Sequence, residues 1–106
     1  MDNETWLLEE GDRIIKKEAD SGLASLSPLE RLIHCLWVAD YGMRNAGDLA
    51  TAEDLYPDFF AEGKRWADEL ALPETSEAFS LHVDQLEKEY FKRFDSICDE
   101  IRSVKT

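Results

Sequence analysis

The chain has 106 residues and a formal net charge of −12, from 24 acidic and 12 basic side chains. A negative charge of this size repels nucleic-acid phosphates and anionic membrane surfaces, and it attracts cationic surfaces in a salt-dependent way. The charge therefore argues against direct binding to nucleic acid or membrane and predicts a basic protein as partner. With 43% hydrophobic and 10% aromatic residues, the composition predicts one folded domain over residues 1–106 rather than a disordered acidic tail.

The N-terminal segment and the cysteines predict a cytoplasmic protein. Residues 1–4 lack the basic and apolar regions of a secretory signal, and no apolar run reaches the roughly 18 residues of a membrane span. Cys35 and Cys98 are far apart and show neither Cys-x-x-Cys nor metal-ligand spacing. We expect both to be reduced thiols in the core.

The first predicted helix covers about residues 5–20 and ends near Gly22. Its apolar positions are Trp6, Leu7, Ile14 and Ile15. Gly11 lies in the middle of this segment and weakens a helix by about 1 kcal/mol relative to alanine. The pattern therefore indicates a helix less regular than the one that follows.

The second predicted helix is the central one and has the clearest start signal. Ser27 is a good N-cap, Pro28 suits the first helical position, and Glu30 completes a capping box. An apolar stripe follows at the three-and-four spacing of one helix face, formed by Leu29, Leu32, Ile33, Leu36, Trp37 and Tyr41. Gly42 is the predicted stop, because glycine readily adopts the left-handed conformation that ends many helices.

Residues 42–48 are predicted to form a turn-rich connection, and its candidate ligand-binding residues are Arg44, Asn45 and Asp48. Two glycines there permit unusual backbone angles and leave polar groups exposed, as in a binding loop. The preferred interpretation is a tight interhelical connection in which Arg44 pairs with Asp40 or Asp48, and a binding loop is the alternative.

Two shorter helices are predicted next, at about residues 49–56 and from Pro57 to about Leu72. Pro57 ends the first of them and opens the second, and Pro73 closes the second. Residues 74–83 predict a connector with about one helical turn near Phe79.

The last predicted helix begins at Asp84, as a cap, and is the longest uninterrupted amphipathic segment. Its apolar stripe is formed by Leu86, Tyr90, Phe94, Ile97, Ile101 and Val104. We expect this helix to pack lengthwise on the helix that begins at Ser27. The alternative is a coiled-coil dimer through the stripe, so the protein is either a monomer or a homodimer. The chain as a whole predicts an all-α fold, a single compact bundle of four to five helices with a long C-terminal helix.

The chain has no recognisable catalytic or cofactor motif, so no catalytic residue, cofactor or metal site is predicted. Glu30 and His34 are four residues apart, a spacing that places two metal ligands on one helix face, and Asp40 lies further along the same helix. An ordinary ion pair is the preferred interpretation because no third ligand is near. A small metal-dependent enzyme using these three residues is the alternative.

Acidic residues are concentrated in the two middle helices. Side chains three or four residues apart on a helix have Cβ atoms about 5–6 Å apart, so acidic rows can present a regular anionic surface to a groove built for phosphates. The predicted partner-binding residues are Glu53, Asp54, Asp58, Glu62, Asp68 and Glu69. The sequence thus predicts a non-enzymatic acidic helical domain that binds a basic protein surface. The alternative is that the charge serves only solubility.

Several segments resemble a bacterial family of small acidic helical proteins of unknown function that includes DNA mimics. They are the capped helix from Ser27 to Trp37, the Asn45-Ala46-Gly47 turn, and the helix at 86–101 with Glu89-Tyr90-Phe91 at its centre. At this turn, where the chain has Asn45-Ala46-Gly47, family members carry an asparagine-glycine-glycine-aromatic run. The resemblance implies an all-helical fold and, for some members, binding to a DNA-binding protein in place of DNA. An immunity or antitoxin protein that neutralises a cationic toxin is a further alternative, since it needs the same acidic surface.

Overall fold

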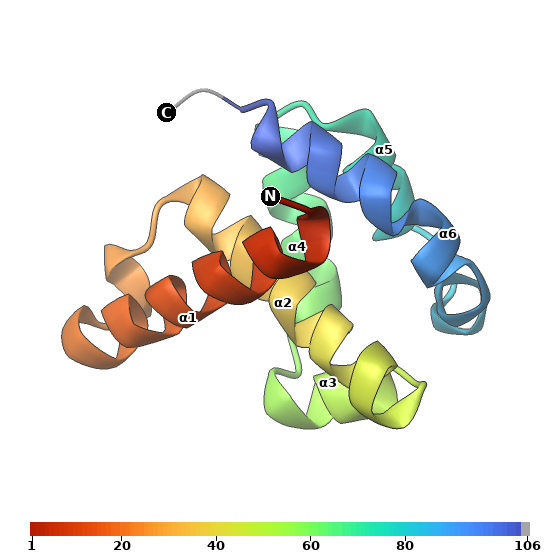
Figure 1. The fold of residues 1–106 in the computed structure, drawn as a ribbon, viewed down its shortest axis with the longest axis horizontal. Helices are drawn as coiled ribbons and strands as arrows, with labels where there is room; N and C mark the ends of the chain where they lie inside the picture. Colours follow the sequence, from red (N-terminus) through yellow and green to blue (C-terminus); the bar gives the residue numbers. More distant parts are fainter. Residues whose placement is uncertain (105–106) are drawn as a thin grey trace.

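The computed structural model describes residues 1–104, which form six α-helices, one short 3-10 helix and no strand (Figure 1). The all-α class and the long C-terminal helix are as predicted, with more helices than expected. The elements are α1 (Asn3–Ser21), η1 (Leu23–Ser25), α2 (Pro28–Ala46), α3 (Ala50–Leu55), α4 (Phe59–Glu69), α5 (Pro73–Ala78) and α6 (Val83–Arg102).

The central helix α2 begins with the predicted capping box. The Ser27 hydroxyl accepts a hydrogen bond from the Glu30 N–H at 3.2 Å, and the Glu30 carboxylate accepts one from the Ser27 N–H at 2.9 Å. The helix runs through the middle of the molecule and contacts α1, α3, α4 and α6 (Figure 1). Most of its side chains are buried, which explains why its sequence is the most apolar in the chain.

The prediction that Gly42 ends this helix is wrong. The helix α2 continues to Ala46 and ends at Gly47, which has the left-handed φ of 73° and donates its N–H to the Met43 carbonyl at 3.0 Å. Gly42 is needed for a different reason. A Cβ at this position would lie 2.7 Å from the carbonyl oxygen of Asp48, because the chain folds back over the helix there.

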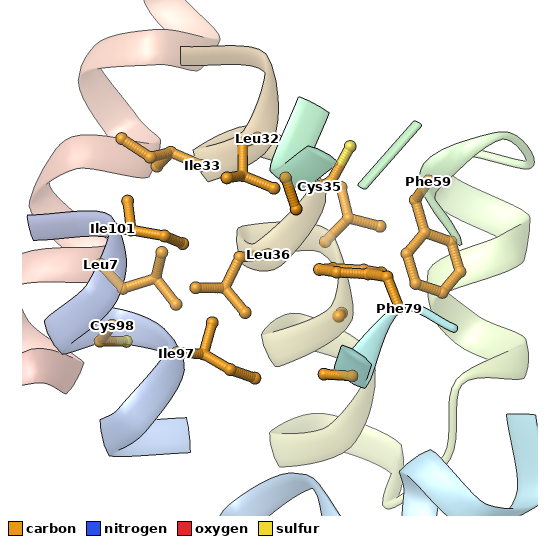
Figure 2. Close-up of a cluster of buried hydrophobic side chains, with 14 of the residues drawn as sticks. Leu7, Leu32, Ile33, Cys35, Leu36, Phe59, Phe79, Ile97, Cys98 and Ile101 are labelled. Atoms are coloured by element: carbon orange, nitrogen blue, oxygen red, sulfur yellow. The ribbon is translucent and has the colours of Figure 1, made fainter. Parts of the chain in front are cut away.

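The helices α1 and α6 both pack against α2. In α1, Lys17 pairs with Glu30 near the start of α2 at 2.8 Å, and Glu4 lies 3.7 Å from Arg44 near its end. In α6, Tyr90 reaches Asp40 on α2. Figure 2 shows the resulting core, in which Leu7 of α1, Leu36 of α2 and Ile97 and Ile101 of α6 belong to one cluster.

The predicted connector at residues 74–83 does hold one short helix, but this helix, α5, lies before Phe79, at Pro73–Ala78, rather than around it. Pro73 begins α5 instead of only ending the previous helix. Glu100 of α6 supplies the missing cap, because its carboxylate accepts hydrogen bonds from the N–H of Glu74 at 3.0 Å and of Thr75 at 2.8 Å. A tertiary contact rather than a local signal therefore stabilises this short helix.

Candidate partner-binding surface

Three of the predicted binding residues gather around the turn between α3 and α4. Glu53 and Asp54 lie on α3, and Asp58 immediately precedes α4. All three are exposed, and none has an ion-pair or hydrogen-bond partner for its carboxylate within residues 1–104. These carboxylates are therefore available to an external cation.

An exposed apolar side chain lies among these carboxylates. Leu55, the last residue of α3, is 52% exposed, whereas Ala52 on the same helix is fully buried. We name the segment Glu53–Asp58, with its three free carboxylates and Leu55, the acidic turn. An apolar centre with a charged surround is a common arrangement in protein interfaces.

Two other predicted residues have partners inside the molecule. Glu62 accepts a hydrogen bond from the Tyr56 hydroxyl and lies 3.7 Å from the Arg31 guanidinium, which leaves its side chain 20% exposed. Asp68 pairs with Lys64 at 2.7 Å and accepts a hydrogen bond from Ser76. Lys64 and Ser76 both lower the pKa of Asp68. These contacts reduce the charge that Glu62 and Asp68 offer to a partner.

Glu69 is exposed and free of partners in the described chain, but it lies away from the acidic turn. Glu69 is eleven positions after Asp58, which corresponds to about 16 Å along α4. The structure thus divides the six predicted residues into the acidic turn, the two partnered carboxylates, and Glu69 at the far end of α4.

The predicted loop at residues 42–48 is mostly helix, and its polar side chains bond within the molecule. Arg44 donates from Nε to both carboxylate oxygens of Asp40 at 3.0 Å. Asn45 donates to the Tyr41 carbonyl at 2.8 Å, and Asp48 accepts from the Thr51 N–H at 3.2 Å. The preferred interpretation, in which Arg44 pairs with Asp40, is therefore the one found, and the alternative of an open binding loop is wrong.

The Asp40 carboxylate is the centre of a buried network that links α2 to α6. Only 3% of Asp40 is exposed, and it also accepts a hydrogen bond from the Tyr90 hydroxyl at 2.7 Å. Burial raises the pKa of Asp40, although the bonds from Tyr90 and Arg44 oppose this. Arg44 in turn lies over the Phe91 and Phe94 rings, at 5.1 and 4.9 Å from their centroids. The sequence placed Asp40 on the central helix and Tyr90 in the apolar stripe of the last helix, but it did not indicate that the two side chains bond to each other.

The proposed metal ligands Glu30, His34 and Asp40 each have a different environment. Burial raises the pKa of Glu30, but hydrogen bonds from Lys17, Ser27 and Arg13 outweigh this and lower it to about 2. His34 lies 3.7 Å from Glu18, and burial lowers its pKa. No group of three metal-ligating side chains is present in the part of the chain that the structure describes.

Both cysteines are free and buried, as expected for core thiols. Burial raises the pKa of Cys98 to about 12 and that of Cys35 as well, which makes both thiols unreactive. Among residues 1–104, no helix combines the length and the apolar character needed to cross a bilayer.

No protein-family model matches the chain, and neither a curated protein nor a solved structure matches it.

Proposed function

We propose that the protein binds a basic protein surface through the acidic turn, with Glu69 as a more distant contact. The observation that carries this proposal is the combination of three unpartnered carboxylates with an exposed leucine in one six-residue segment. A role in solubility alone would explain the carboxylates but would not favour an exposed apolar side chain among them. A partner that fits has lysines or arginines around a small apolar depression.

The use of carboxylates elsewhere in the molecule supports this choice of surface. Glu30 and Asp40 are buried in ion pairs. Glu87 accepts a hydrogen bond from the N–H of the residue just before α3, and Glu100 accepts one from the first turn of α5. These acidic residues stabilise the fold. The carboxylates of the acidic turn make no such contact in residues 1–104, so the fold does not account for them.

A DNA-binding regulator or nuclease is the partner class that we propose, because a groove built for phosphates is rich in lysine and arginine. In this form of the proposal the acidic turn and Glu69 take the places of phosphate groups. The expected consequence is that the protein and duplex DNA compete for one groove.

The proposal is tested by affinity capture from a lysate of the source cell, at about 50 mM and about 300 mM salt, with two matched variants. The first variant changes Glu53→Gln, Asp54→Asn and Asp58→Asn. The second changes Glu9→Gln, Asp12→Asn and Asp20→Asn on α1, which are also exposed and also unpartnered in the described chain. Both variants remove three negative charges, so they differ only in where the charge is lost.

We expect the wild-type protein to retain a basic protein at low salt and to release it at high salt. The α1 variant should retain the same protein and the acidic-turn variant should lose it. Equal loss in both variants would show that only net charge matters, and no specific capture at either salt would contradict the proposal. Displacement of the captured protein by duplex DNA would support the proposal that the acidic turn occupies a DNA-binding groove. Failure of displacement would show that the basic partner binds through another surface.

A further inference from the structure

A hollow of about 360 Å³ lies where α1, the start of α2 and the end of α6 meet. This volume falls within the roughly 300–1,000 Å³ of pockets that bind small molecules. Five apolar side chains from three segments of the chain line it, namely Trp6, Leu29, Ile33, Ile101 and Val104. We name it the α1–α6 pocket. It lies away from the acidic turn, so it is a second and independent feature.

The polar groups that remain available in this pocket are hydrogen-bond donors. Arg102 donates from one terminal nitrogen to Asn3 at 2.8 Å and to the Met1 carbonyl at 3.2 Å. Its Nε and its other terminal nitrogen have no acceptor within residues 1–104. The Ser27 hydroxyl accepts from Glu30 but donates to no group in the described chain.

The acidic groups on the wall of the pocket are already neutralised. Glu30 pairs with Arg13 at 2.9 Å and with Lys17 at 2.8 Å, and Glu10 pairs with Arg13 at 2.8 Å. A ligand cation would therefore find no free carboxylate there and would face the Arg102 guanidinium. A ligand carboxylate would find an unsatisfied guanidinium edge and a hydroxyl, next to an apolar wall.

We propose that the α1–α6 pocket binds a medium-chain alkanoate, with the hydrocarbon against the five apolar side chains and the carboxylate on Arg102 and Ser27. Charge-assisted hydrogen bonds to a guanidinium are among the stronger polar contacts in proteins. Because the protein as a whole carries a charge of −12, non-specific attraction does not favour an anion. Binding of an alkanoate would therefore depend on this local site.

Octanoate is a suitable probe, with octylammonium and octanol as comparisons of the same chain length. Binding is followed by amide chemical shifts in NMR spectra and by tryptophan fluorescence, since Trp6 lines the pocket. We expect saturable octanoate shifts centred on Trp6, Ile33 and Ile101. Octylammonium should not produce them, and octanol should do so more weakly.

The matched variants are Arg102→Gln and Arg65→Gln. Each arginine lies over a tryptophan ring, with Arg102 at 5.4 Å from the Trp6 centroid and Arg65 at 4.4 Å from that of Trp66, but only Arg102 lines the pocket. Arg102→Gln should weaken octanoate binding by about tenfold, which is about 1.4 kcal/mol. Arg65→Gln should leave it unchanged.

A third variant, Val104→Trp, fills the pocket from a residue beyond the end of α6 and should abolish the octanoate shifts without disturbing the helices. The proposal is overturned if octanoate up to about 10 mM, a range suited to a weak Kd, gives no saturable shift at the pocket residues. Equal shifts from octylammonium, or equal weakening by Arg102→Gln and Arg65→Gln, would overturn it as well.

Discussion

At the scale of single residues, Ala71 is the one non-glycine residue among residues 1–104 with a positive φ. It follows the C-terminal end of α4 with a φ of 58°, in the left-handed region where a Cβ atom is disfavoured. Leu72 donates its N–H to the Ala67 carbonyl at 2.9 Å across this turn, which is the pattern of a helix C-cap normally built on glycine. Ala71→Gly should raise the free energy of unfolding by about 0.5–1 kcal/mol in urea denaturation.

The control for this prediction is Ala61→Gly in the same helix. Ala61 is exposed in the first turn of α4, where glycine should lower the free energy of unfolding by up to about 1 kcal/mol. The two alanine-to-glycine changes therefore have opposite predicted signs. Destabilisation by Ala71→Gly comparable to that of Ala61→Gly would show that the turn does not adopt this conformation.

Glu30 gives a pH dependence with a defined direction. Its pKa is lowered from 4.5 to about 2 in the folded protein, so its contribution to stability is present above pH 4.5 and is lost as the pH falls toward 2. Glu30→Gln should lower the free energy of unfolding by about 1–2 kcal/mol at pH 7, through loss of the ion pairs with Arg13 and Lys17, while the glutamine amide oxygen can keep the capping-box hydrogen bond. Denaturation followed by circular dichroism should show this difference shrinking toward pH 2.

The exposed Glu9 is the reference for that measurement. Glu9→Gln should change stability by less than about 0.5 kcal/mol at either pH, because its carboxylate has no partner in the described residues. A difference between wild type and Glu30→Gln that stays constant from pH 7 to pH 2 would contradict the role given to the Glu30 charge.

At the scale of helices, close approach at glycine positions shapes the packing. Gly63 on α4 is buried, and a Cβ there would lie 2.6 Å from two carbon atoms of the Phe79 ring, which is itself only 3% exposed. The ring has no space to move aside. Gly63→Ala should therefore lower the free energy of unfolding by about 1–3 kcal/mol.

Helix propensity alone predicts the opposite sign for this variant, because alanine favours a helix by about 1 kcal/mol over glycine. Thermal and urea denaturation distinguish the two effects directly. Gly63→Ala combined with Phe79→Leu should be less destabilising than the sum of the two single changes, since the smaller side chain relieves the contact. A more stable Gly63→Ala protein would show that α4 and Phe79 are further apart than described.

The helices also show what local sequence signals can and cannot predict. The start of α2 depends on Ser27 and Glu30, which are three residues apart, and the stripe of α6 depends on a regular spacing, so both were predictable. The role of Gly42 and the presence of α5 depend on Asp48 folding back and on Glu100 from a distant helix. No pattern within a short window of sequence contains that information.

At the scale of the whole molecule, the acidic residues divide into those that stabilise the fold and those whose carboxylates have no partner within residues 1–104. The sequence predicted where carboxylates concentrate but not which of them have partners. Glu62 lies near Arg31, which is far from it along the chain, and Asp68 accepts a hydrogen bond from Ser76, which lies after the end of α4. The exposure of Leu55 was also hidden, since the residue fits the apolar pattern of a short helix. The acidic turn is thus visible only in three dimensions.

The most direct test of this account is the dissociation constant of the captured basic partner, purified and measured at about 150 mM salt against the wild-type protein and the two triple variants. Circular dichroism first confirms that both variants keep the helical fold. The account predicts that the acidic-turn variant binds at least about tenfold more weakly, while the α1 variant binds nearly as well as wild type. Equal weakening in the two variants would contradict a specific role of the acidic turn and would show that binding depends only on the net negative charge.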